Sequence, residues 1–248
     1  MTTAFYAPPE QFRGARVMLP PNETRHAVRA LRHGPGDEIV VVDGVGGWHR
    51  VRLEQTGTDQ ALGTILTTRH DVGEPPAESV LAVGILHKRS RYETLIEKAV
   101  ELGITTIVPL TTARAERTTV RADRLQKLMV AAMKQCGRSR LPVLEAPCSL
   151  ESALASFPSA QAFCCHESGA GRQALSDALH PVADETAVIL AVGPEGGFTD
   201  HEVATATDAG AELVHLGPRR LRAETAAMTA ASALMLRRST YPAQRTPH

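Results

Sequence analysis

The feature that most constrains the fold is a regular alternation of apolar runs and helical segments over the last two thirds of the chain. The apolar runs suit buried strands, and the segments between them have apolar residues at helical spacing. The expected strands are residues 79–86, 104–110, 142–144, 160–165, 187–192 and 212–216. The expected helices are residues 92–102, 121–136, 150–157, 172–179, 199–209 and 223–238. This order predicts an α/β fold with a mostly parallel sheet covered by helices.

The first 72 residues have a different pattern, in which short strands are separated by glycine turns. The expected strands are residues 16–19, 38–42, 48–53 and 61–68, which predict a small barrel or sandwich. One helix, at residues 22–33, interrupts them and ends at a Gly-Pro-Gly stop. A polar linker with two prolines, at 71–78, separates the two patterns. The predicted domains are therefore residues 1–72 and 78–242.

Composition argues against several classes of protein. The chain has 248 residues with 27 basic and 27 acidic side chains, so any RNA contact must depend on local patches. The N-terminus has no secretion signal, and no apolar run is long enough to span a bilayer. The four cysteines have neither CxxC nor metal-ligand spacing. We expect a cytoplasmic protein with reduced thiols, without a metal site and without a membrane partner.

Three of the expected strands end in glycine-containing loops. The strand at 187–192 leads into GPEGGF at 193–198, the strand ending at Cys165 leads into HESGAG, and the strand ending at Leu216 leads into GPRRLRAETA. If these strands are neighbours, their loops converge on one crevice, the usual place for a small ligand in an α/β sheet. The sequence has neither a P-loop nor a GxGxxG fingerprint, which disfavours ATP, GTP and NAD.

These loops resemble the RsmE family of the SPOUT superfamily. The resemblance rests on GPEGGF at 193–198 and LGPRRLRAETA at 216–226, and it extends to KAVELG at 98–103, QCGR at 135–138 and HAVRALR at 26–32. The joint pattern covers nearly the whole chain. Arg220 departs from the pattern, which has an aliphatic residue before Leu221.

The resemblance implies an activity that the residues alone do not show. Members of this family methylate N3 of a uridine in 16S ribosomal RNA of the small subunit. The resemblance therefore implies an N-terminal PUA-like β-barrel that helps to bind RNA, and a SPOUT α/β domain with a trefoil knot. It also implies S-adenosylmethionine as the cofactor and a homodimer.

The resemblance and the loops together assign the site residues. Arg222 is the first candidate to stabilise a uracil anion, and Glu224 and Glu195 are weaker candidates for the base. Each residue also has a structural alternative. Glu224 could be an acidic residue in the first turn of a helix, where the helix dipole favours it, and Arg222 could form a structural ion pair. The expected cofactor walls are His166, Glu167, Leu190, Val192, Gly193, Glu195, Gly196, Gly197, Leu216, Gly217, Leu221, Arg222 and Ala226.

Basic side chains form the expected RNA contacts, although each one alone could be ordinary surface charge. They are Arg25, His26, Arg29, Arg32, Lys88, Arg89, Arg91 and Arg138. Two other functions stay open at this point. One is a SPOUT enzyme that methylates another RNA position, such as a ribose 2′-hydroxyl. The other is a ribosome-assembly factor that has lost catalysis.

Overall fold

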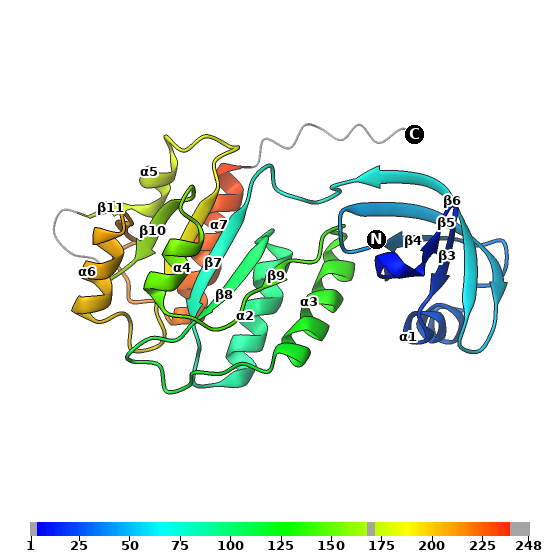
Figure 1. The fold of residues 1–248 in the computed structure, drawn as a ribbon, viewed down its shortest axis with the longest axis horizontal. Helices are drawn as coiled ribbons and strands as arrows, with labels where there is room; N and C mark the ends of the chain where they lie inside the picture. Colours follow the sequence, from blue (N-terminus) through cyan, green and yellow to red (C-terminus); the bar gives the residue numbers. More distant parts are fainter. Residues whose placement is uncertain (1–3, 168–171, 239–248) are drawn as a thin grey trace. The chain divides into compact units, whose positions relative to one another are not determined.

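The computed structural model describes residues 4–167 and 172–238 of the chain (Figure 1). The chain divides into two compact units. The first comprises Met1–Glu74 with Met129–Leu141, and the second comprises Pro75–Leu128 with Pro142–His248. Residues 129–141 thus cluster with the N-terminal region, although the sequence pattern places them in the second. The domain limits given above stay a prediction.

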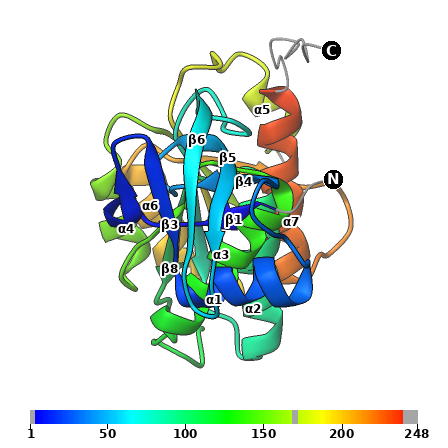
Figure 2. The same cartoon turned by 90° about the vertical axis from the view of Figure 1, so that its right-hand side faces the viewer.

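The first unit is built on a curled six-stranded sheet (Figure 2). Its order is β1-β4-β5-β6-β3-β2, and a 3₁₀ turn at Pro9–Gln11 precedes β2. The strands are β1 (Phe5–Tyr6), β2 (Phe12–Arg13), β3 (Arg16–Leu19), β4 (Glu38–Val42), β5 (Gly47–Thr56) and β6 (Ala61–His70). In β5, buried residues such as Val51 and Leu53 alternate with exposed ones, as a strand with one face on a core requires. The β-rich fold expected for this region is confirmed.

The helix expected at residues 22–33 is shorter and less regular than predicted. α1 spans Pro21–Arg25, and a π-helical turn, His26–Ala30, follows it. Arg32 lies beyond the helix, in a left-handed conformation with φ of 61°. The wider π turn interrupts the 3.6-residue spacing, so the basic residues of this segment do not share one regular α-helical face.

The second unit contains a seven-stranded sheet in the order β11-β13-β10-β12-β7-β8-β9, and all its pairings are parallel. The strands are β7 (Ser79–Gly84), β8 (Thr106–Leu110), β9 (Val143–Leu144), β10 (Gln161–Cys165), β11 (Gln173–Ala174), β12 (Val188–Val192) and β13 (Glu212–His215). Every residue of β7, β8 and β12 is buried, as expected for strands covered on both faces. The predicted parallel α/β sheet is confirmed.

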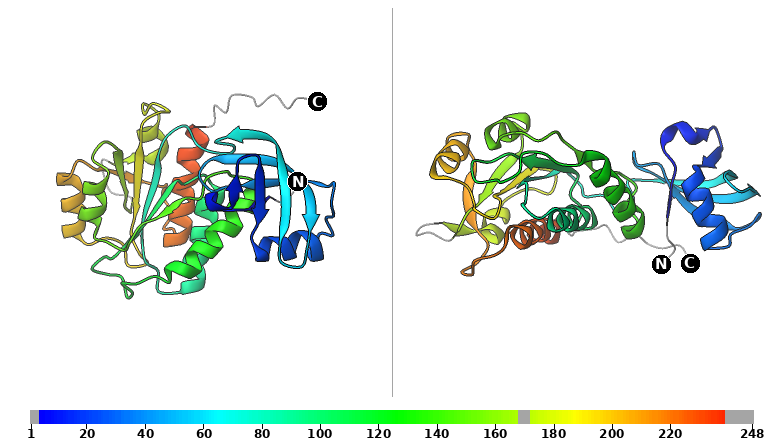
Figure 3. Two further views of the ribbon diagram at one scale, coloured as in Figure 1. Left: turned by 45° about the vertical axis from the view of Figure 1, so that its right-hand side comes forward. Right: turned by 90° about the horizontal axis from the view of Figure 1, so that it is seen from below.

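Helices cover both faces of this sheet (Figure 3). α2 and α7 pack together on one face, and α4 and α6 pack together on the other. The helices that lie wholly in this unit are α2 (Arg89–Glu101), α4 (Leu150–Ser156), α5 (Leu175–Leu179), α6 (Asp200–Asp208) and α7 (Ala223–Arg237). A further helix, α3 (Ala122–Cys136), begins in this unit and belongs to the first from Met129 onward. The helix expected at 172–179 is partly wrong, because its first residues form β11. Within the ranges that the structure describes, no helix is both long and apolar enough to cross a membrane.

Candidate active site

The described parts of the three loops meet at one edge of the parallel sheet, as their sequence predicts. Residues 168–171, which hold the glycines of the loop after β10, lie outside the described residues. β13, β10 and β12 are adjacent strands, so their carboxyl ends lie side by side. The loops that follow them surround a cavity of about 610 Å³. This volume lies in the range of small-molecule sites. The predicted cofactor walls line this cavity, except for Leu190, which is fully buried between β7 and β10 and belongs to the core.

Glycines let the backbone of the β12 loop pack closely on itself and on β7. A Cβ at Gly193 would lie 3.0 Å from backbone atoms of Gly197 and Phe198. A Cβ at Gly84, the last residue of β7, would lie 2.8 Å from Pro194 Cα and 2.6 Å from its Cδ. A side chain at Gly84 would collide with the backbone of Pro194, and one at Gly193 would require the facing backbone to give slightly, so the shape of the loop favours glycine at both positions. No sequence pattern marks Gly84 as a site residue, because its contact Pro194 is distant in the chain.

Arg114 holds the β12 loop from the segment that follows β8. Its Nη1 donates to the carbonyl oxygen of Gly196 at 2.9 Å and to that of Phe198 at 3.0 Å. On the far side of the loop, α6 begins with a capping box between Thr199 and Glu202. Glu202 also accepts a hydrogen bond from the backbone N–H of Ala113 at 2.9 Å. Polar contacts to residues 113–114 therefore fix the second half of the loop and the start of α6.

Arg222 and Glu224 differ in their access to the cavity. Arg222 is the N-cap residue of α7, is exposed and lines the cavity. Glu224 does not line it, and its side chain is 14% exposed. Its Oε1 lies 3.7 Å from Nε of Arg91, whereas its Oε2 is buried without a hydrogen-bond partner among the described residues. Arg91 itself lines the cavity, so Glu224 touches the site through Arg91.

Other polar side chains orient the cavity walls. Glu195 accepts the backbone N–H of His87 at 3.1 Å, which ties the β12 loop to the loop after β7. Arg172 donates to Nδ1 of His166 at 2.8 Å, and it was not among the predicted site residues. Arg220, the departure from the family pattern, lies 3.0 Å from Glu167 in an exposed ion pair. Such an exposed pair contributes little to stability.

The cysteine near the cavity is not a nucleophile. Cys165 lines the cavity, and burial raises the pKa of its thiol far above the ordinary value. The neighbouring Cys164 is also buried, which raises its pKa to about 12. Both thiols therefore stay protonated at neutral pH, and a thiolate is the reactive form of cysteine. Among the described residues, no group of His, Cys, Asp or Glu has the arrangement of a metal site.

Seven of the eight predicted RNA contacts fall into two sets, one in each unit. Arg25, His26, Arg29 and Arg32 are exposed in the first unit, where Arg25 pairs with Asp59 at 2.6 Å. The other set lies in the second unit, in the first turn of α2 and the residue before it. Its members are Lys88, Arg89 and Arg91. Arg91 is half-buried, and the other two residues are exposed.

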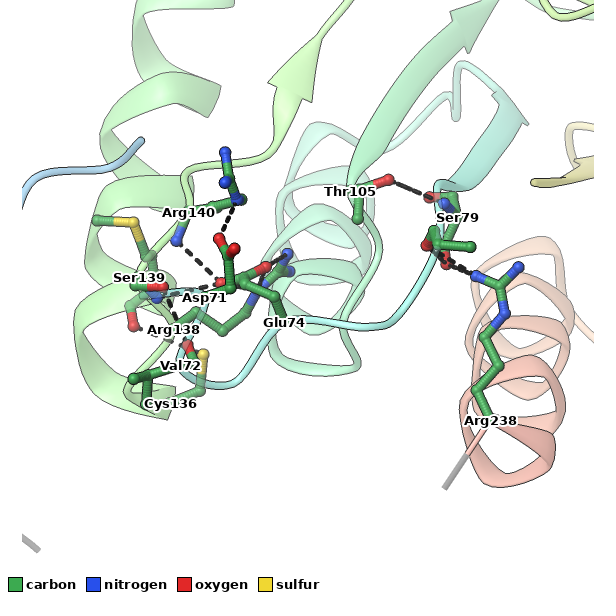
Figure 4. Close-up of polar contacts among 12 residues, drawn as sticks. Asp71, Val72, Glu74, Ser79, Thr105, Cys136, Arg138, Ser139, Arg140 and Arg238 are labelled. Atoms are coloured by element: carbon green, nitrogen blue, oxygen red, sulfur yellow. Dashed lines mark hydrogen bonds and ion pairs between the residues drawn. The ribbon is translucent and has the colours of Figure 1, made fainter. Parts of the chain in front are cut away.

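Arg138 has a structural position instead of the predicted place in an RNA-binding surface. It is 2% exposed, and its Nη2 lies 2.6 Å from a carboxylate oxygen of Glu74 (Figure 4). Glu74 also accepts the backbone N–H groups of Ser139 at 3.1 Å and Arg140 at 2.9 Å. The pair joins the end of the first β-rich segment to residues 138–140 within the first unit. Sequence spacing could not reveal this, because the two partners are 64 residues apart.

Two family models match the chain, and they define its class. Residues 73–235 match the model of the RNA methyltransferase domain, and residues 19–66 match the RNA methyltransferase PUA domain. The first match spans more than half of the chain and includes every residue that lines the cavity. The class defined by fold and site is therefore that of RNA methyltransferases.

Comparison with individual relatives identifies the family within this class. Ribosomal RNA small subunit methyltransferase E of Synechocystis is 34% identical over 224 residues, which cover 88% of this chain and 72% of the relative. The enzyme of the same name from Mycobacterium tuberculosis is 33% identical over 237 residues, 89% and 86% of the two chains. A Neisseria gonorrhoeae structure of that name, bound to S-adenosylmethionine, has a TM-score of 0.83 at 33% identity and covers 95% and 98%. The chain belongs to the family of ribosomal RNA small subunit methyltransferase E, RsmE, as its motifs predict.

Proposed function

We propose that this protein transfers the methyl group of S-adenosylmethionine to N3 of a uridine in 16S ribosomal RNA of the small subunit. The observation that carries the proposal is the cavity at the ends of β10, β12 and β13, whose lining combines the glycines of the β12 loop with Arg222. Its volume of about 610 Å³ has room for a bent cofactor of this size beside a nucleobase.

The residues present fit the cofactor. Glycines at 193, 196 and 197 let backbone N–H and C=O groups approach a ligand without interference from side chains. Arg114 and the Thr199–Glu202 capping box keep this loop in place before any ligand binds. When bound, S-adenosylmethionine supplies an electrophilic methyl group on a sulfonium. The walls align it with the nucleophile, and such alignment is the main requirement of a displacement reaction.

Side chains that line the cavity would activate the uracil base that accepts the methyl group. Uracil N3 carries a proton, and it becomes a good nucleophile only when that proton leaves. In our proposal, the guanidinium of Arg222 stabilises the negative charge that develops on the base. Glu195 lines the cavity and is better placed than Glu224 to accept the proton. Glu224 holds Arg91 at the rim through their ion pair.

The remaining parts of the proposal concern the partners. The exposed basic residues of the first unit would hold RNA phosphates, in keeping with the PUA match. A homodimer, a trefoil knot and a cytoplasmic location follow from the family resemblance and remain part of the proposal.

Two measurements on the purified protein test this function. Calorimetry should give saturable binding of S-adenosylmethionine at one site per chain. With a methyl-labelled cofactor, label should enter 16S ribosomal RNA from a strain that lacks the corresponding enzyme. If the protein binds RNA but neither binds the cofactor nor transfers label, it is a non-catalytic assembly factor and the proposal is wrong.

A further inference from the structure

The second unit contains another cavity beside the first turn of α2. It has a volume of about 30 Å³ and lies between the end of β7, the start of α2 and the segment that leads into α3. Arg89, Tyr92 and Glu93 of α2 line it, whereas Arg91 lines the larger cavity. Successive helical residues are rotated by about 100°, so Arg89, Tyr92 and Glu93 share one side of the helix and Arg91 lies on the opposite side. The first turn of α2 thus separates the two cavities.

Tyr92 provides an unused hydrogen-bond donor in the small cavity. The residue is 4% exposed, and its hydroxyl is buried without a hydrogen-bond partner among the described residues. Buried polar groups are nearly always paired, so such a hydroxyl needs an explanation. Burial raises the pKa of Tyr92 well above its usual value, so the hydroxyl keeps its proton and can donate.

The charges around this hydroxyl favour an anion. Arg89, Arg117 and Arg121 line the cavity, and no ion pair with a described carboxylate engages any of them. Glu93 is the one carboxylate in the lining, and its Oε2 lies 3.3 Å from Arg124, which offsets its charge. The N-terminus of α2, a helix of 13 residues, adds the positive end of its dipole.

The size of the cavity decides between possible anionic groups. A volume of about 30 Å³ admits about one water-sized group, so a nucleobase does not fit. One phosphate oxygen can enter and accept from the Tyr92 hydroxyl, while the other oxygens remain at the exposed Arg89 and Arg121 and the half-buried Arg117. Guanidinium groups match this geometry, because they donate to phosphate through two parallel N–H groups.

We infer that this cavity binds one backbone phosphate of the RNA whose target uridine enters the larger cavity. The inference rests on the proposed function and adds to it a defined phosphate site. Arg91 and Arg89, on opposite sides of one helical turn, would then contact the target nucleotide and a neighbouring phosphate respectively. A phosphate held here fixes the register of the strand, because phosphate contacts position RNA while base contacts select it.

Tyr92→Phe is the sharpest test, because it removes only the hydroxyl. Filter binding of the full-length variant to 16S ribosomal RNA should show affinity about tenfold weaker than that of the wild type, as for a lost hydrogen bond to a charged group. The slope of log affinity against log salt should not change, because no charge is lost. Arg117→Gln should also weaken binding, and it should reduce that slope by about 0.7 to 0.9.

Controls separate this inference from failures of folding and of the proposed function. Lys127→Gln removes an exposed charge of α3 outside the cavity and should leave affinity unchanged. Tyr92→Phe should bind S-adenosylmethionine like the wild type and unfold at the same or a higher urea concentration. If the wild type transfers methyl groups and both cavity variants bind RNA equally well, the cavity holds only water and the inference is wrong.

The alternative ligand for the small cavity is a free anion, such as inorganic phosphate. Inorganic phosphate is titrated into the wild type and Tyr92→Phe at constant ionic strength. If it binds the wild type below millimolar concentration and the variant loses this binding while its RNA affinity stays normal, the site serves a free anion. That result would also overturn the inference. A wild type that transfers no methyl group to RNA would refute the proposed function instead.

Discussion

At the scale of single residues, Arg222 is the side chain on which the proposed chemistry depends most. It is exposed at the rim of the large cavity, at the N-cap of α7. In the proposed function, its backbone contributes to the cofactor wall, whereas its guanidinium stabilises the acceptor base. The two roles can therefore be separated by substitution of the side chain.

Arg222→Gln should lower kcat by roughly 100-fold or more, the usual loss when one donor to a developing anion is removed. Affinity for S-adenosylmethionine should change little, because the backbone contacts remain. Single-turnover methyl transfer and calorimetry on the same preparation measure both effects. Arg222→Lys keeps the charge and should fall between the wild type and Arg222→Gln. Equal rates for all three proteins would remove Arg222 from the mechanism.

Gly84 shows that a residue can shape the site without touching a ligand. A side chain there would collide with the backbone of Pro194, so Gly84→Ala must displace the β12 loop. We expect a loss of about 1–3 kcal/mol in unfolding free energy and at least tenfold weaker cofactor binding. Urea unfolding and calorimetry measure these changes. Gly34→Ala is the matched control, because its Cβ would meet no atom within 4 Å.

At the scale of elements, the loop between β12 and α6 is held by Arg114, which bonds two of its carbonyl groups. Arg114→Gln should weaken cofactor binding about tenfold, because two charge-assisted hydrogen bonds are lost at a partly solvated position. Arg114→Lys keeps the charge, but its shorter side chain does not bring the ammonium to the position of Nη1, so it should restore little of the affinity. Full recovery by lysine would mean that charge, rather than the position of the loop, controls binding.

The first unit has its own polar anchor in Glu74 and Arg138. The carboxylate and guanidinium side chains are 5% and 3% exposed, so loss of the carboxylate removes a short charge-assisted contact from a buried guanidinium. Glu74→Ala should lower the unfolding free energy by about 3–5 kcal/mol. Asp71→Asn removes the exposed pair with Arg140 and should cost below about 1 kcal/mol. Urea unfolding of both variants measures the contrast, and similar losses would contradict it.

These elements also explain how far the sequence could predict the structure. The strands and most helices of the second unit follow from hydrophobic periodicity, and the meeting of three strand-end loops follows from parallel topology. Contacts between distant segments leave no periodic signal, so Gly84, Arg114 and the Glu74–Arg138 pair could not be assigned their roles. The helix predicted at residues 22–33 differs from the observed one for another reason. A local π turn replaces the regular spacing on which the prediction depended.

At the scale of the whole molecule, the two matched domains cover most of the chain. The PUA domain match spans residues 19–66, and the RNA methyltransferase domain match spans residues 73–235. The proposed function has two parts, RNA binding and methyl transfer. In this proposal, exposed basic residues would hold RNA phosphates, and the cavity of the second unit would hold the methyl donor and the target base. The chain has no net charge, so RNA affinity must come from these local patches and must fall steeply with added salt.

The position of the transferred methyl group tests this account most directly. Small-subunit particles and naked 16S ribosomal RNA from a strain without the corresponding enzyme are treated with the protein and S-adenosylmethionine, and the RNA is mapped by mass spectrometry at nucleoside resolution. We predict one added methyl group, on N3 of a single uridine, in at least one of the two substrates. A methyl group on a ribose 2′-oxygen, or none in either substrate while the cofactor is bound, would contradict the account.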